Sequence, residues 1–79
     1  MDHIKNIEKL GKEMNAANDR VNELIDVVGT KTAARGEAFD AALVASDAFR
    51  DAVRAARAAG VQFQLRLGSN YEFRKVVAL

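Results

Sequence analysis

Apolar residues recur at alternating spacings of three and four through the first third of the chain. They are Ile7, Leu10, Met14, Ala17, Val21, Leu24 and Val28. This spacing is typical of an amphipathic helix with a heptad seam. Asp2 precedes the periodic stretch as a suitable N-cap, and Gly29 follows it as a suitable C-terminal stop. The pattern therefore predicts a helix over about residues 2–28.

Two features of this expected helix are unfavourable for helix formation. Gly11 lies inside it, where glycine costs about 1 kcal/mol relative to alanine. The face opposite the seam carries Asn15, Asn18 and Asn22 together with acidic residues. Asparagine is a poor helix former, so either a partner contacts this amide row or water simply solvates it.

A second, alanine-rich stretch predicts a helix over about residues 32–59, ending at Gly60. On a helical wheel the alanines share one side with Phe49 and Val53, whereas Phe39 and Leu43 lie further round. An alanine strip permits close backbone approach to another helix, and the larger side chains supply bulk for a sheet or an apolar edge. The two sides of this helix are thus expected to meet different neighbours.

Four residues, GTKT at 29–32, join the two expected helices. Thr30 or Thr32 can cap the second helix. Glycine, lysine and threonine together do not make a phosphate-binding P-loop, because the spacing and the preceding strand are missing. A connector this short predicts an antiparallel helical hairpin.

From residue 61 the period of the apolar residues changes to two, which indicates a β-hairpin over about residues 61–77 with one buried face. The expected inward residues are Val61, Phe63, Leu65, Leu67, Tyr71 and Phe73. A three-residue GSN loop would pair Leu67 with Tyr71 and Leu65 with Phe73. The parity then slips, so a bulge is expected near Arg74 and Lys75, or the strand leaves the sheet there.

These elements predict an α+β fold, in which an antiparallel two-helix hairpin precedes a C-terminal two-stranded antiparallel β-hairpin. The chain has 79 residues, which suits one small domain over 1–79. A chain of this size hides only about 60% of its unfolded surface, and it has no cysteine for a disulfide. We therefore expect a homodimer.

Charge is unevenly distributed along the chain although the net charge is only +1. Residues 1–49 hold nine acidic and six basic side chains, and residues 50–79 hold two acidic and six basic ones. This asymmetry indicates either a basic contact surface or ordinary cations at a helix C-terminus. Asp47 with Arg50 and Asp51 with Arg54 have the i,i+3 spacing of weak surface ion pairs, which is typical of a solvated face.

The residues that carry catalytic chemistry are sparse. The chain has one histidine, His3, and no cysteine. The parts of a nucleophilic triad are therefore missing. The carboxylates fall on expected helix surfaces next to basic residues, where a raised pKa is not expected. We therefore expect no enzyme activity, no cofactor, no metal site and no small-molecule substrate. No run of about 18 apolar residues occurs, so we also expect no membrane span and no membrane partner. The lack of cysteine suits a reducing interior, and we expect a cytoplasmic location.

A two-stranded hairpin has two unpaired edges and is not stable alone, so it must lie on the helices, pair with a second copy or join a partner's sheet. This favours a stoichiometric protein-interaction module that regulates or inhibits a larger partner. Small plain chains of this kind are similar in style to accessory proteins of phages and mobile elements, including anti-CRISPR inhibitors. The predicted partner-binding residues are Gln62, Gln64, Arg66, Glu72, Arg74, Lys75, Arg50, Arg54 and Arg57.

Two alternatives to that function remain. The order helix, helix, hairpin, with AAGVQFQLRLGSNYEF at the passage into the sheet, is similar to the HU/IHF family of DNA-bending dimers. The chain has no proline to insert between base steps, so no residue of that family is assigned here. The polar hairpin face nevertheless allows a nucleic-acid-associated dimer that contacts phosphates through the basic C-terminal region. The second alternative is a structural subunit of a larger assembly.

Overall fold

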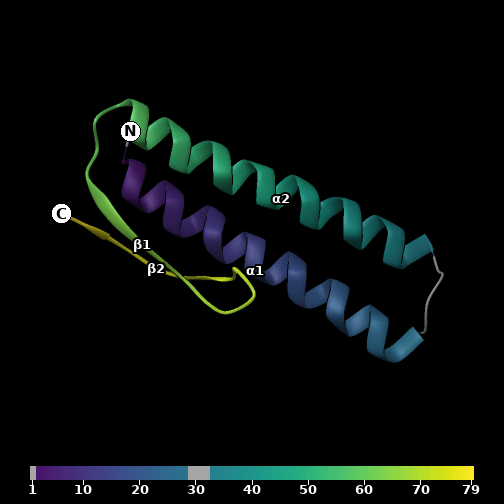
Figure 1. Cartoon of the computed structure of the whole chain (residues 1–79). Coiled ribbons are helices and arrows are strands. Elements are labelled where there is room, and N and C mark those ends of the chain that lie inside the picture. Colours follow the sequence, from purple (N-terminus) through teal and green to yellow (C-terminus); the bar gives the residue numbers. More distant parts are fainter. Residues whose placement is uncertain (1, 29–32) are drawn as a thin grey trace.

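The computed structural model describes residues 2–28 and 33–79. Two long helices are followed by two short strands: α1 (His3–Val28), α2 (Ala33–Ala58), β1 (Phe63–Leu67) and β2 (Phe73–Ala78). The helices lie antiparallel and side by side, and the β-hairpin lies along one half of the helical pair (Figure 1). The predicted α+β fold, a helical hairpin followed by an antiparallel β-hairpin, is confirmed.

Specific backbone hydrogen bonds set two of the helix ends. The Lys5 N–H donates to Asp2 Oδ1 at 3.1 Å, so Asp2 is the N-cap that the sequence predicts. At the end of α2, the chain reverses through Gly60, whose φ of 80° favours glycine. The predicted stop at Gly29 and caps at Thr30 or Thr32 lie outside the described residues.

The reversal at Gly60 is a Schellman motif. The Gly60 N–H donates to the Arg57 carbonyl and the Val61 N–H donates to the Ala56 carbonyl, each at 3.0 Å. These bonds satisfy carbonyls that the last turn of a helix leaves without partners. The motif turns the chain back towards α1, and β1 begins three residues later at Phe63.

The core lies between the helices and under the hairpin. The seam of α1 is buried at Ile7, Met14 and Val21, as its spacing predicts. Small side chains of α2 allow the close approach of the two helices. The buried residues of α2 are Ala38, Ala42, Phe49, Ala52, Val53 and Ala56. No described helix is long and apolar enough to span a bilayer.

The strand register differs from the predicted one. Leu67 pairs with Phe73 rather than with Tyr71, and Leu65 pairs with Val76 rather than with Phe73. The loop therefore spans residues 68–72 instead of the three predicted residues. The Gly68 N–H donates to the Glu72 carbonyl at 2.8 Å and closes this wider turn.

The bulge predicted near Arg74 and Lys75 is confirmed at Arg74. The register shifts there, because Arg66 pairs with Lys75 while Leu67 pairs with Phe73. The extra residue restores parity, so Phe63, Leu65 and Val76 pack against the core.

Two residues that the strand pattern predicts to face inward are exposed. Leu67 is 41% exposed and Tyr71 is 79% exposed. Tyr71 belongs to the turn and has a φ of 61°, so the alternation of a strand does not apply to it. Its N–H donates to the Gly68 carbonyl at 3.0 Å, which holds the turn in this form.

Candidate interaction groove

The hairpin is anchored in the groove between the two helices by Phe73. This side chain is only 5% exposed, and its ring lies edge-on to Phe49 of α2 at a centroid distance of 5.9 Å. A Cβ atom placed on Gly11 of α1 would overlap the Phe73 ring. Gly11, which looks like a defect in the predicted helix, thus makes room for the ring.

Asn15 of α1 holds the backbone of the same residue. Its Nδ2 donates to the Phe73 carbonyl at 2.6 Å, and its Oδ1 accepts from the Phe73 N–H at 2.8 Å. The amide side chain therefore satisfies both backbone groups of β2 at that point, as a neighbouring strand would. Of the two open interpretations of the asparagine row, a partner applies to Asn15, and that partner is the chain's own hairpin.

Replacement of Asn15 by alanine is expected to lower the free energy of unfolding by about 1–3 kcal/mol, because two part-buried backbone groups of Phe73 lose their partner. Asn22→Ala is the matched control. Asn22 is exposed on the same helix, so its replacement should change stability by no more than a few tenths of a kcal/mol. Urea unfolding followed by circular dichroism measures both. Equal effects of the two substitutions would contradict the role of Asn15 as a clamp.

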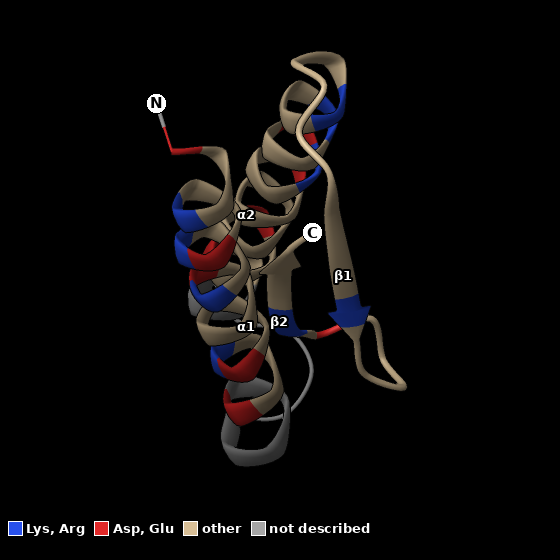
Figure 2. Cartoon of the chain, turned by 90° about the vertical axis from the view of Figure 1, so that its left-hand side faces the viewer, with Lys and Arg blue, Asp and Glu red and all other residues tan. Residues whose placement is uncertain are grey.

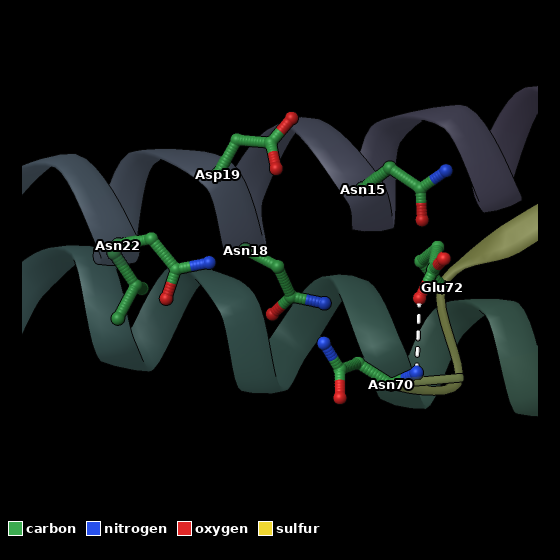
Figure 3. Close-up of a pocket in the computed structure, with 7 residues that line it drawn as sticks. Asn15, Asn18, Asp19, Asn22, Asn70 and Glu72 are labelled. Atoms are coloured by element: carbon green, nitrogen blue, oxygen red, sulfur yellow. Dashed lines mark hydrogen bonds between the residues drawn. The ribbon is translucent and has the colours of Figure 1, made fainter. Parts of the chain in front are cut away.

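The hairpin lies along one half of the helical pair and leaves part of the other half without a covering element (Figure 1). Three adjoining hollows open here, and Asn18 lines all three. The polar one, of about 590 Å³, lies between the asparagine row of α1 and the hairpin loop. Figure 3 shows Asn18, Asp19 and Asn22 on one side of it and Asn70 and Glu72 on the other.

The other two hollows are more apolar. One, of about 380 Å³, is lined by Met14 and Phe49 from the helices and by Leu67 and Tyr71 from the hairpin tip. The next, of about 100 Å³, lies further along the helices. We call the bare groove the uncovered stretch lined by Asn18, Val21, Phe39, Ala42, Leu43, Ser46, Leu67 and Tyr71.

Large apolar side chains remain exposed along the bare groove. Phe39 is 49% exposed and Leu43 is 53% exposed, and both lie in the N-terminal half of a long helix. The covered half of the same groove holds Phe73 in a buried position. The difference between the two halves is the hairpin, which is too short to cover the whole length of the helices (Figure 1).

The predicted partner-binding residues fall into two groups. Gln62, Gln64, Arg66 and Lys75 are exposed on the outward face of the hairpin. Arg74 is exposed at the bulge, and Glu72 belongs to the turn before it. Figure 2 shows basic positions, in blue, on both strands near the hairpin tip.

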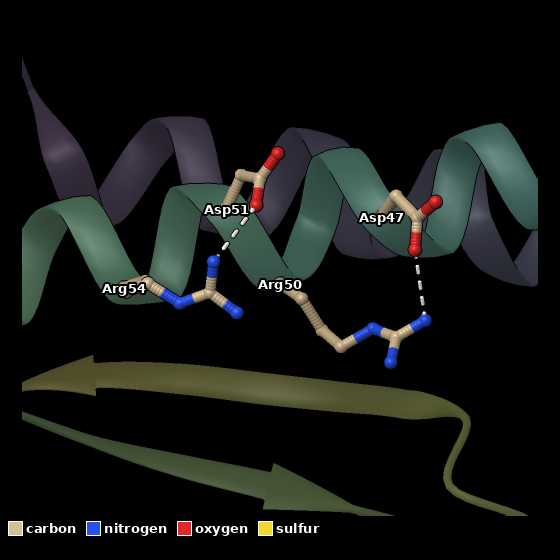
Figure 4. A network of polar contacts seen from close by, with 4 residues as sticks. All are labelled: Asp47, Arg50, Asp51 and Arg54. Carbon is tan, nitrogen blue, oxygen red and sulfur yellow. Dashed lines mark hydrogen bonds and ion pairs between the residues drawn. The ribbon is translucent and has the colours of Figure 1, made fainter.

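The second group, Arg50, Arg54 and Arg57, lies on α2. The predicted ion pairs are confirmed, since Arg50 lies 2.9 Å from Asp47 and Arg54 lies 3.4 Å from Asp51 (Figure 4). Both pairs are exposed, so each contributes only a few tenths of a kcal/mol. The Arg57 guanidinium lies 5.6 Å from the centre of the Phe63 ring and so contacts β1 of the hairpin.

The pKa of Glu72 departs from the ordinary value of a glutamate. The pKa of its carboxyl is lowered by its own backbone N–H, by the backbone N–H of Asn70 and by the nearby charge of Arg74. The Asn70 N–H donates to Glu72 Oε2 at 3.1 Å, and an Arg74 nitrogen lies 3.6 Å from Oε1. The ionised carboxylate thus favours the folded form of the hairpin loop.

The contribution of Glu72 to the free energy of unfolding should decrease as the pH falls. Because the folded state lowers the pKa, the stabilisation is present at neutral pH and is lost as the pH falls below about 4.3, the ordinary value for glutamate. Glu72→Gln should therefore melt slightly below wild type at pH 7, and the difference should close in acid. Melting curves from neutral pH to pH 3 measure the difference, and a gap that widens in acid would contradict this assignment.

Comparison with known proteins does not place the chain in a family. No protein-family model, curated protein or solved structure matches it. Within residues 2–28 and 33–79, no group of three or more His, Cys, Asp or Glu side chains is arranged to hold a metal ion. The bare groove, along which Phe39 and Leu43 are exposed, is the candidate site.

The sequence did not point to this site. Phe39, Leu43 and Tyr71 are absent from the predicted partner-binding residues, which favour the basic hairpin and the arginines of α2. The helical wheel gave one indication of this site, since Phe39 and Leu43 lie away from the alanine strip. The pattern alone could not show that the hairpin stops short of them.

Proposed function

We propose that this chain is a non-catalytic binding protein whose bare groove is covered by another polypeptide, and that it acts stoichiometrically as a small regulator or inhibitor. The observation that carries the proposal is the exposure of Phe39, Leu43 and Tyr71 along one continuous groove. Contiguous exposed apolar surface with a polar rim is characteristic of interaction sites. Apolar and amide side chains line the groove, and these groups suit contact with another polypeptide.

The conformation of Tyr71 supports the proposal. A φ of 61° costs a bulky residue about 1–2 kcal/mol, and nothing in the hairpin turn requires tyrosine there. Strained residues are concentrated at binding and catalytic sites, and tyrosine is among the residues that dominate interface energies. We assign Tyr71 as an anchor that the partner contacts.

Replacement of Tyr71 by asparagine separates these two effects. Asparagine tolerates the left-handed region, so the variant should be as stable as wild type or up to about 1 kcal/mol more stable. Loss of the ring should weaken association at the groove at least tenfold, as for an interface anchor. Thermal melting and a binding titration give the two readouts. A variant that binds as tightly as wild type would remove Tyr71 from the site.

A photocrosslinking experiment tests the proposal as a whole. Phe39 is replaced by p-benzoylphenylalanine in the full-length chain, which is irradiated in the cells that make it. The same substitution at Ala16, which is exposed on α1 and lines none of the three hollows, is the control. We expect a discrete polypeptide adduct from position 39 and none from position 16. The absence of any adduct specific to position 39 would overturn the proposed function.

The other functions predicted from the sequence stay predictions. Nucleic-acid association would rely on the cations of residues 50–79, of which Arg50, Arg54 and Arg74 already lie beside carboxylates. This pairing reduces the charge that they offer to phosphates. The structural-subunit role and the cytoplasmic location likewise stay predictions.

A further inference from the structure

The chain exposes more surface than a compact monomer of its size. A folded monomer of 8.6 kDa exposes about 4,700 Å², whereas this chain exposes 5622 Å². The excess of about 900 Å² matches the roughly 800 Å² that each partner contributes to a standard interface. The radius of gyration, 14.2 Å, is likewise above the value of about 11.6 Å for a compact chain of this length.

The two ends of the molecule carry opposite charge. The half with the bare groove, residues 16–28 and 33–48, has six acidic and two basic residues. The stretch 49–79, which includes the hairpin, has six basic and two acidic ones. Asp19, Glu23, Glu37 and Asp40 are exposed in the acidic half, and Arg66 and Lys75 are exposed on the outward face of the hairpin. One end of the chain is therefore complementary to the other end of a second copy.

The outward face of the hairpin is also partly apolar. Val77 pairs with Gln64 and so shares its outward face, where it is 43% exposed. The Leu79 N–H donates to the Gln62 carbonyl, which continues the ladder, and Leu79 is 78% exposed. An apolar strip bounded by Arg66 and Lys75 is therefore available to cover Phe39 and Leu43.

We infer that the occupant of the bare groove is the β-hairpin of a second copy of this chain, in an inverted two-fold dimer. This inference rests on the proposed function and names the polypeptide that covers the groove. The hairpin covers only one half of the helical face (Figure 1). A two-fold rotation across the helix axes puts each hairpin over the bare half of the other protomer. The two hairpins then form one layer between two helical layers.

This arrangement has a specific consequence at the two-fold axis. The hairpin tip lies at the boundary between the covered and bare halves, and Tyr71 lies at that tip. The two tips therefore meet at the axis, and Tyr71 of each protomer lies near its equivalent. Residues close to a two-fold axis contact their own copies.

The first test is the mass of the protein in solution. At high micromolar concentration, sedimentation equilibrium should give twice the chain's 8.6 kDa. Leu43→Asp should weaken self-association at least tenfold, while Ala41→Asp, at an exposed position outside the groove on the same helix, should leave it unchanged. Circular dichroism confirms that both variants are folded. A wild-type monomer at high micromolar concentration, or equal effects of the two aspartates, would overturn the inference.

The second test addresses the orientation of the copies. The chain has no cysteine, so a single one can be introduced at a chosen position. On mild oxidation, Ser69→Cys should give a disulfide-linked dimer, because Ser69 is exposed in the hairpin tip and the two tips meet at the axis. Ala16→Cys should not, since Ala16 lies on α1 outside the groove. Equal cross-linking from both positions would overturn the inverted arrangement.

The photocrosslinking experiment distinguishes this inference from the proposed function. An adduct from position 39 with twice the mass of the chain supports both. An adduct of any other mass supports the proposed function and overturns the second copy as the occupant. No adduct specific to position 39 overturns both.

Discussion

Replacement of Phe73 by alanine is expected to lower the free energy of unfolding by about 3–5 kcal/mol. The ring lies between α1 and α2 and edge-on to Phe49, and Phe73, only 5% exposed, is the one buried residue of β2. Its removal leaves a cavity at the point where the hairpin joins both helices. A loss of this size is a large fraction of the total stability of a small domain.

The control for this substitution is the neighbouring aromatic residue. Tyr71→Ala removes a ring of similar size only two residues earlier, but Tyr71 is 79% exposed. At a protein concentration low enough for the chain to be monomeric, the free energy of unfolding of this variant should differ from that of wild type by no more than about 0.5 kcal/mol. Urea unfolding monitored by circular dichroism gives both values. Equal losses in the two variants would show that the hairpin is not anchored through Phe73.

Replacement of Gly11 by alanine is expected to destabilise the protein by about 1–3 kcal/mol, which reverses the usual sign of this substitution. In an open helix, alanine is more favourable than glycine by about 1 kcal/mol. At Gly11 the added Cβ would overlap the Phe73 ring, which cannot move away because Phe49 and the Asn15 hydrogen bonds fix it. The steric cost exceeds the gain in helix propensity.

Gly36→Ala is the matched control, because a Cβ at Gly36 of α2 would meet no atom within 4 Å. That variant should be about 0.5–1 kcal/mol more stable than wild type. The double variant Gly11→Ala/Phe73→Leu should lose less than the sum of the two single changes, since a smaller and more flexible side chain tolerates the methyl group. If both glycine variants are more stable than wild type, the Phe73 ring does not pack closely against Gly11.

The proposed dimer connects these stability effects to function. Phe73, Gly11 and Asn15 hold the hairpin on one half of the helical face, and this placement leaves the other half bare. A substitution that loosens the hairpin should therefore also weaken self-association, although it lies outside the bare groove. Leu43→Asp should weaken self-association while the chain stays folded. Variants that loosen the hairpin should therefore lose both stability and self-association, whereas Leu43→Asp should lose self-association alone.

Local patterns were sufficient for much of the architecture. The three-and-four spacing of Ile7, Met14 and Val21 predicts the buried face of α1, because helix periodicity is a property of the backbone. Gly60 predicts the end of α2, and the slip of parity near Arg74 predicts the bulge. Each of these signals acts over a few residues, so the sequence contains them completely.

The strand register could not be obtained in the same way. Alternation predicts an inward Tyr71, but the turn hydrogen bonds of Gly68 and Glu72 place Tyr71 in a loop with a positive φ. A five-residue loop and a three-residue loop are both compatible with the sequence GSN between apolar residues. The choice depends on where Phe73 finds a cavity, and that cavity is formed by residues 58 and 62 positions earlier in the chain.

The sequence by itself determined the helices, the hairpin, the buried seam of α1 and the opposite charge of the two ends, because these follow from local periodicity and composition. Only the tertiary structure gave Gly11 and Asn15 their roles, because each acts on a residue that is distant in sequence and adjacent in space. It alone also separated Phe49, which Phe73 covers, from Phe39 and Leu43, which remain exposed. Phe39 and Leu43 remain exposed because the hairpin is shorter than the helices on which it packs. The pattern of residues along the chain does not show how far one packed element extends along another.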